Sequence, residues 1–129
     1  MVKRNFWLML GASGAALAVI TGAFGAHILE SIISEKVFIT YQKAVRYQMY
    51  HSIALIIVTL LSSQTSTKAL NIAGWSFLIG ILTFSGSLYL LVFTGASWLG
   101  AITPIGGVAF VIGWISLGFS GFRDKTGKI

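Results

Sequence analysis

Four long apolar stretches constrain this chain more than any other feature of its sequence. They are Phe6–Ala26, Tyr47–Ser62, Ala69–Thr94 and Ile102–Phe122, and none of them contains Lys, Arg, Asp or Glu. An α-helix needs about 20 apolar residues to cross the hydrocarbon core of a bilayer. We therefore predict an all-α integral membrane protein, a four-helix antiparallel bundle with spans at approximately 6–26, 44–63, 69–94 and 102–122.

The composition agrees with a location inside lipid. Only 9% of the 129 residues are charged, whereas a soluble domain carries about 25%. This length predicts a single membrane domain over residues 1–129. The absence of cysteine excludes disulfides, thiolate metal sites and a cysteine nucleophile.

The net charge of +6 predicts membrane topology rather than nucleic-acid binding. With four spans, one side of the membrane receives Lys3, Arg4, Lys68, Arg123, Lys125 and Lys128, and the other receives Lys36, Lys43 and Arg46. Because loops rich in Lys and Arg stay in the cytoplasm, we expect a multi-pass protein of the cytoplasmic membrane with both termini inside the cell.

Small residues recur every three or four positions in three of the stretches. Such faces let helix backbones approach closely in lipid, where apolar side chains gain little from burial. The spacing therefore predicts three tightly packed faces: Gly11, Ala15, Ala18, Gly22 and Gly25; Ala73, Ser76, Gly80, Thr83 and Ser87; and Gly106, Ala109, Gly113, Ser116 and Ser120.

The most polar segment, residues 27–46, connects the first two spans. Ser34 can cap a helix, and Glu35 suits the first turn, where the helix dipole favours an acid. No helix-breaking residue follows before the second span. We therefore expect the second helix to begin near Glu35 with an amphipathic extension at the membrane surface.

Because successive helices run in opposite directions, polar residues from all four helices come to lie in one half of the bundle, the outer half. Polar side chains within a membrane must face protein or water and find partners. The predicted cluster is centred on His51, with the i, i+3 and i, i+4 neighbours Tyr47 and Gln48 on the same helix. Its other members are His27, Ser85, Ser87, Tyr89 and Thr103.

Several segments of the chain resemble the signature blocks of the family of unknown function numbered 423, small multi-span proteins of bacterial inner membranes with relatives in eukaryotes. The blocks are Gly22–His27, Tyr47–His51, Phe84–Tyr89, Ile102–Gly107 and Gly113–Trp114. The resemblance covers nearly the whole chain and implies a membrane protein with about four spans. It implies no activity and no catalytic residue.

Three kinds of chemistry are open to these residues. A buried His51 can be a hydrogen-bonded lock to Ser85, Ser87 or a tyrosine, or it can relay protons. His27 and Glu30 are three residues apart and could place two zinc ligands on one helical face, with His51 as a third. A hydrolase is disfavoured because few acids are available to orient a catalytic base. We expect no catalytic residue, no bound metal and no cofactor.

The favoured hypothesis is a non-enzymatic membrane protein with a polar pocket in its outer half. The pocket would hold a lipid headgroup, a small ligand or a membrane-protein partner. Lys43 and Arg46 lie where they could meet an anionic headgroup. The alternative is an oligomeric transporter or channel for a small solute or proton, since one four-span protomer could form a pore only in a homo-oligomer.

Overall fold

The computed structural model describes residues 3–65 and 67–124, and it is helical almost throughout. The helices are α1 (Arg4–His27), α2 (Glu35–Ser62), α3 (Lys68–Gly80), α4 (Gly86–Thr94) and α5 (Thr103–Asp124). Short 3₁₀ segments, η1 (Leu29–Ser31) and η3 (Ser97–Ala101), lie in two connections, and a π-helical segment, η2 (Ile81–Ser85), joins α3 to α4. Lys125 and Lys128, which contribute to the charge asymmetry, lie outside the described residues.

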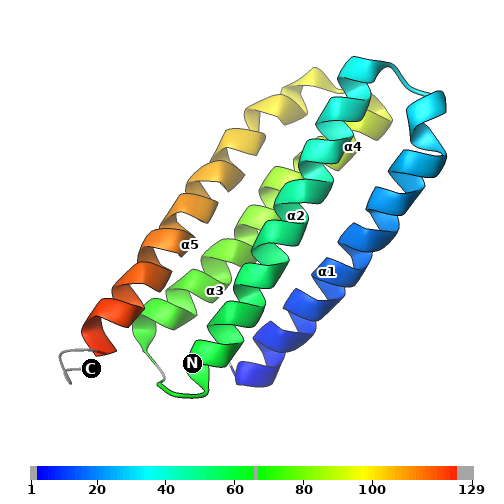
Figure 1. The fold of residues 1–129 in the computed structure, drawn as a ribbon. Coiled ribbons are helices and arrows are strands. Elements are labelled where there is room, and N and C mark those ends of the chain that lie inside the picture. The colour runs from blue at the N-terminus through cyan, green and yellow to red at the C-terminus, as the bar shows by residue number, and fades with distance from the viewer. Residues whose placement is uncertain (1–2, 66, 125–129) are drawn as a thin grey trace.

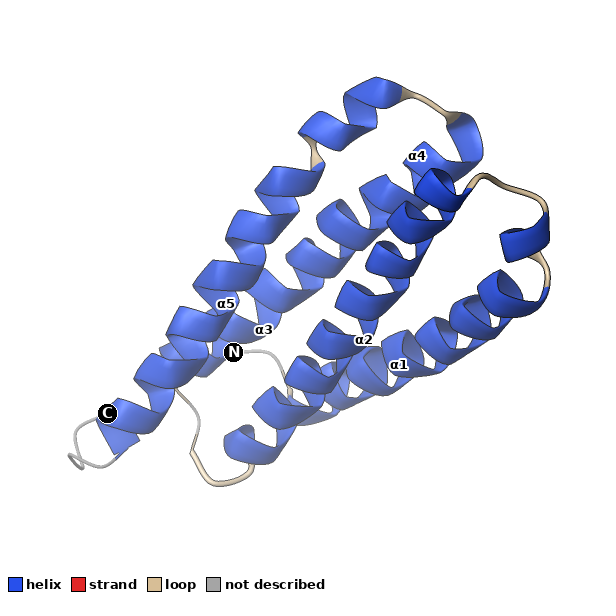
Figure 2. Ribbon diagram, turned by 45° about the horizontal axis from the view of Figure 1, so that its top comes forward, coloured by secondary structure: helices blue, strands red, loops and turns tan. Residues whose placement is uncertain are grey.

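The helices stand side by side as four antiparallel columns (Figures 1 and 2). α3, η2 and α4 together form the third column, so four helical segments are long and apolar enough to cross a membrane. The start of α1, the end of α2, the start of α3 and the end of α5 lie at one end, which we call the terminal end (Figure 1). The α1–α2 and α4–α5 connections lie at the other, the loop end. The predicted all-α four-helix bundle is confirmed.

The second helix begins where its capping signal predicts. The Val37 backbone N–H donates to Ser34 Oγ at 3.3 Å, and Glu35 is the first helical residue. A capping serine and an acid in the first turn both satisfy the positive end of a helix. The extension before the apolar stretch is amphipathic, since Phe38 and Tyr41 are buried while Lys36 and Lys43 are exposed.

The predicted small faces lie at the helix interfaces. Gly11, Ala18 and Gly25 are buried on α1, Ala73 and Gly80 on α3, and Gly106, Gly113 and Ser120 on α5. A Cβ at Gly11 would lie 2.8 Å from the Ser52 carbonyl oxygen, and one at Gly113 would lie 2.6 Å from the Phe77 ring. These glycines are required because the neighbouring helix occupies the space of a side chain.

Large apolar side chains cover the outside of the bundle. Met9, Leu82, Ile105 and Phe119 are examples in which more than half of the side-chain surface is exposed. A core runs between the helices and contains Trp7, Ala54, Leu55, Val58, Ala73, Phe77 and Phe110. An exterior of this kind is suited to hydrocarbon, whereas in water it would form a large sticky surface.

Candidate functional site

Polar side chains gather on two sides of α2. On the side that faces α1 and α4, the Gln48 amide links three helices. Its Nε2 donates to the Gly14 carbonyl of α1 at 2.8 Å, and its Oε1 accepts from the Tyr89 hydroxyl of α4 at 2.7 Å. Gln48 is buried, and both ends of its amide have hydrogen-bond partners within the bundle. A polar group inside the hydrocarbon region requires such partners.

Two further side chains on this side bond to backbone carbonyls of neighbouring helices. The Tyr41 hydroxyl donates to the Thr21 carbonyl at 2.5 Å, and Ser85 Oγ donates to the Ala44 carbonyl at 2.8 Å. Tyr41 lies in the amphipathic extension of α2, and its ring is only 2% exposed because it packs into the bundle. Its ring fills the space above Gly25 at the end of α1.

On the side that faces α5, His51 is held by two hydrogen bonds. Trp114 Nε1 donates to His51 Nε2 at 3.1 Å, so the imidazole proton lies on Nδ1, which donates to the Tyr47 carbonyl at 2.7 Å. The ring also stacks on Phe110, with centroids 3.4 Å apart and planes 8° apart. With both nitrogens bonded and 4% exposure, the imidazole is fixed in one orientation.

Trp114 is the partner that the sequence reasoning did not identify. One alternative was a lock in which His51 bonds to Ser85, Ser87 or a tyrosine. The structure has His51 bonded to the Tyr47 carbonyl of its own helix and, across to α5, to Trp114. One signal was available, because an indole N–H within a span must find an acceptor. The helical period shows which face of its own helix a residue occupies, but not how neighbouring helices are rotated toward each other.

The remaining predicted residues lie elsewhere. Ser87 Oγ and Thr103 Oγ1 are 2.6 Å apart and link α4 to the start of α5. His27 is exposed at the last residue of α1. No group of three His, Asp or Glu residues gathers within the part of the chain that the structure describes. The arrangement therefore gives no support to a zinc site formed by His27, Glu30 and His51.

The predicted single cluster is thus divided into separate groups. Gln48, Ser85 and Tyr89 meet between α2 and α4, whereas Tyr47 and His51 lie against α5 and Phe84. The physical reason is that α2 has neighbours on both sides. Residues three positions apart on one helix diverge enough in direction to reach different neighbours.

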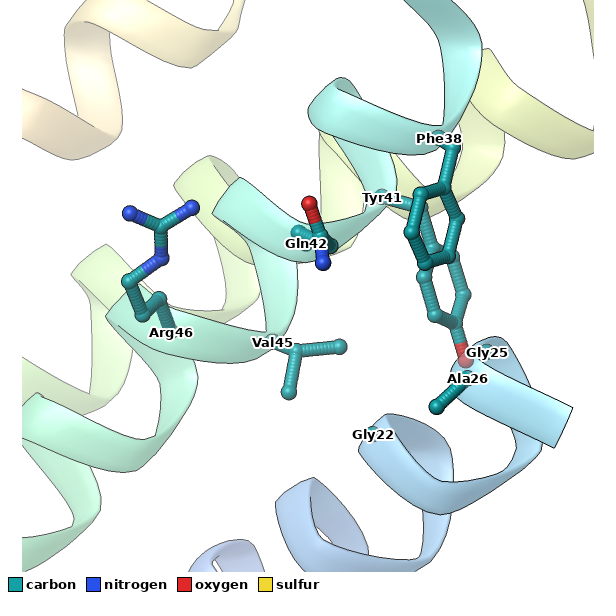
Figure 3. A pocket seen from close by; sticks show the side chains of 8 residues that line it. All are labelled: Gly22, Gly25, Ala26, Phe38, Tyr41, Gln42, Val45 and Arg46. Carbon is teal, nitrogen blue, oxygen red and sulfur yellow. The ribbon is translucent and has the colours of Figure 1, made fainter. Parts of the chain in front are cut away.

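Arg46 lines a crevice between α1 and α2 near the loop end (Figure 3). The crevice has a volume of about 300 Å³. Figure 3 shows Phe38 and Tyr41 reaching toward Gly25 at one side, and Arg46 at the other side. Gln42 and Val45 lie between them, and small residues of α1 form the opposite wall, Gly22, Gly25 and Ala26.

The Arg46 guanidinium has no ion-pair or hydrogen-bond partner among the described residues. Its crevice therefore has an unpaired cation at one edge and mainly apolar residues along its walls (Figure 3). An arginine can extend its charged head toward the membrane surface while its stem packs on apolar groups. Arg46 is thus a predicted site residue that lines a crevice and whose charge remains available to a ligand.

Comparison with known proteins gives a consistent picture. The family described as "Protein of unknown function (DUF423)" matches residues 21–107. A UPF0382 membrane protein of Staphylococcus aureus (strain bovine RF122) is 51% identical over 92% of this chain and 97% of its own length. UPF0382 membrane protein YwdK of Bacillus subtilis is 48% identical over 86% of this chain and 91% of its own length. No solved structure matches.

Proposed function

We propose a function from the premise that this chain belongs to the DUF423 family, whose relatives at about half identity are named as membrane proteins. The proposal is that the protein is a non-enzymatic, multi-pass protein that holds an anionic lipid headgroup in the Arg46 crevice. The unpaired guanidinium beside an apolar wall is the observation that carries it.

The chemistry of the crevice supports an anionic amphiphile. A guanidinium presents several N–H donors in a planar fork that fits the oxygens of a phosphate. Gln42, also on the crevice wall, adds an amide that can bond to a polar headgroup. Val45 and Gly22 leave an apolar surface that an acyl chain can follow into the bilayer. An unpaired basic residue at the edge of hydrocarbon is stabilised by such a counter-ion.

Binding rather than catalysis is favoured by the state of His51. Both imidazole nitrogens are engaged by protein groups, Tyr47 and Trp114, so neither is left to move a substrate proton. Glu30 and Glu35 lie in the α1–α2 connection and at the first residue of α2. They are therefore distant along α2 from His51, which lies beyond the middle of that helix.

We further propose that both termini face the cytoplasm. Lys3, Arg4 and Lys68 all lie at the terminal end of the bundle, whereas Lys36, Lys43 and Arg46 lie toward the loop end. The basic excess at the terminal end supports a cytoplasmic location for it. The Arg46 crevice would then face the outer leaflet. Reporter fusions after Lys68 and within residues 95–101 test this orientation, and cytoplasmic signal from both would contradict it.

Native mass spectrometry tests the lipid proposal. The purified protein is exchanged into micelles with equal amounts of phosphatidylglycerol and phosphatidylcholine, and retained lipid is counted for the natural protein, Arg46→Gln and Lys43→Gln. Lys43 is the matched control, since it is a basic residue of the same helix that does not line the crevice. A charge-assisted hydrogen bond contributes about 1.5–3 kcal/mol, so Arg46→Gln should weaken phosphatidylglycerol retention at least about tenfold.

Two outcomes would contradict the proposal. One is equal retention of phosphatidylglycerol by the natural protein and Arg46→Gln. The other is equal retention of both lipids by the natural protein, which would mean that charge plays no part. Glycerol 3-phosphate, added in place of lipid, separates headgroup from acyl-chain binding: we expect it to bind weakly because it lacks the chains that would pack on Val45.

A further inference from the structure

A second, larger groove lies between α2 and α5, away from the Arg46 crevice. Its volume is about 570 Å³, and its lining is dominated by aromatic rings with one glycine among them: Tyr47, Tyr50, His51, Phe110, Trp114 and Gly107. Both helices that form it belong to candidate membrane spans. A molecule that enters the groove therefore comes from the hydrocarbon of the bilayer.

Two tyrosine hydroxyls in this groove have no hydrogen-bond partner within residues 3–65 and 67–124. Tyr47 and Tyr50 are 37% and 50% exposed, and their rings contact neighbouring rings. Neither hydroxyl forms a hydrogen bond with any residue that the structure describes. A hydroxyl that faces hydrocarbon is costly to leave unpaired, because lipid tails carry no acceptor and the bilayer core holds no water to bond with it. The groove thus offers two O–H donors that require acceptors.

The other polar atoms of the groove are already used. Trp114 Nε1 donates to His51 Nε2, and His51 Nδ1 bonds to the Tyr47 carbonyl. His51 stacks on Phe110, and Tyr47 stacks on Phe84 with centroids 4.6 Å apart. This interlocked set of rings gives the groove a rigid aromatic wall. Gly107 leaves the groove open on its α5 side, because glycine has no side chain that would fill the space.

We propose that this groove binds a planar, apolar molecule that carries carbonyl oxygens, of the chemical class of the naphthoquinones. Flat rings stack on the aromatic wall, and two carbonyl oxygens accept from the Tyr47 and Tyr50 hydroxyls. A saturated acyl chain has no acceptor for these hydroxyls. A charged ligand is disfavoured because the described residues that line the groove include no Lys, Arg, Asp or Glu, and both nitrogens of His51 are already bonded to protein groups.

Quenching of tryptophan fluorescence by 2-methyl-1,4-naphthoquinone tests the proposal in detergent micelles. We expect saturable quenching that is largely lost in Trp114→Phe and kept in Trp75→Phe, because Trp75 lies in a separate aromatic group with Phe6 and Trp7. The double variant Tyr47→Phe with Tyr50→Phe keeps both rings and removes both hydroxyls, so we expect roughly tenfold weaker binding. Gly107→Leu, which fills the groove, should abolish it.

A matched ligand and a matched variant complete the test. 2-Methylnaphthalene has the same rings without carbonyls, and we expect it to bind roughly tenfold more weakly. Arg46→Gln should bind the quinone as the natural protein does, which separates this site from the lipid crevice. Equal binding of the two ligands, or an undiminished affinity in the double tyrosine variant, would overturn the proposal. So would a homodimer, detected by native mass spectrometry, in which Trp114 is shielded from the quinone.

Discussion

The two most extensive helix contacts, α1 with α2 and α3 with α5, use glycine in different ways. On α1, Gly11 allows the α2 backbone to approach, so that a Cβ there would lie 2.8 Å from the Ser52 carbonyl oxygen. On α3 and α5, Gly80 and Gly113 instead receive whole aromatic rings, those of Phe110 and Phe77. The α1–α2 interface thus includes a direct approach of backbones at Gly11 as well as a ring at Gly25, whereas Gly80 and Gly113 both receive rings between α3 and α5.

The difference extends to the hydrogen bonds. Gln48 and Tyr41 of α2 donate to carbonyls of α1, at Gly14 and Thr21, whereas aromatic packing dominates between α3 and α5. In lipid, close backbones and interhelical hydrogen bonds take over the role that burial of apolar surface has in water. The comparison indicates that α1 is held by polar bonds and close contact, and that α5 is held by ring packing.

The largest expected effect comes from a methyl group placed where a backbone lies. In Gly106→Ala the new Cβ would collide with the Phe84 backbone nitrogen and lie 2.6 Å from Thr83 Oγ1. Backbone in a packed bundle cannot move aside cheaply, so we expect a loss of about 2–3 kcal/mol in the free energy of unfolding, measured by SDS titration in mixed micelles. Gly107→Ala is the control, because its Cβ would make an ordinary contact of 3.9 Å with the Phe84 ring. If both variants lost the same free energy of unfolding, α5 would not pack closely against the Phe84 backbone at Gly106.

Gln48→Leu should come next, because it removes the amide that joins α1, α2 and α4. The Gly14 carbonyl loses its side-chain donor and Tyr89 loses its strongest acceptor, for an expected loss of about 1–3 kcal/mol in the same titration. Gln42→Leu, on the exposed side of α2, should change stability by less than about 0.5 kcal/mol. If Gln48→Leu is as stable as the natural protein, the polar account of the α1 interface is wrong.

Trp114→Phe tests the α5 side of the comparison. It removes the one hydrogen bond to His51 Nε2 while keeping an aromatic ring, so we expect a loss of about 1 kcal/mol. Trp98→Phe replaces an exposed indole in the α4–α5 connection and should have little effect. A loss above about 3 kcal/mol would contradict the view that ring packing, rather than this bond, holds α5.

The smallest effect is expected at Ser52. Its hydroxyl is fully buried and has no hydrogen-bond partner among the residues that the structure describes, while Ser85, which is 1% exposed, donates to the Ala44 carbonyl. Removing an unpaired polar group is neutral or favourable, so Ser52→Ala should change the free energy of unfolding by less than about 0.5 kcal/mol, and Ser85→Ala should cost about 1 kcal/mol. A reversed order of these two serines would refute the hydrogen-bond assignment.

Much of the fold could be predicted because it depends on patterns within single helices. Apolar length predicted the four spans, and spacing of small residues predicted which faces pack. The start of α2 followed from Ser34 and Glu35. Each of these signals is local, so one sequence suffices to read it.

The site was harder to predict because it depends on rotations between helices. The alternating direction of the helices indicates which residues lie at the same depth in the membrane. It does not indicate that Gln48 faces α4 while His51 faces α5. The π-helical segment adds to the difficulty, since its wider turn shifts the faces of the residues that follow it in α4, among them Ser87 and Tyr89. Nothing in the sequence of Ile81–Ser85 marks that change.

The most direct test of the lipid-binding account is thermal stability as a function of lipid charge. A ligand that binds the folded state raises its stability in proportion to the logarithm of ligand concentration, once the site is largely filled. In nanodiscs of phosphatidylcholine with increasing phosphatidylglycerol, the midpoint of thermal unfolding should rise for the natural protein and for Lys43→Gln, and stay flat for Arg46→Gln. Parallel rises in all three proteins would contradict the claim that Arg46 holds an anionic headgroup.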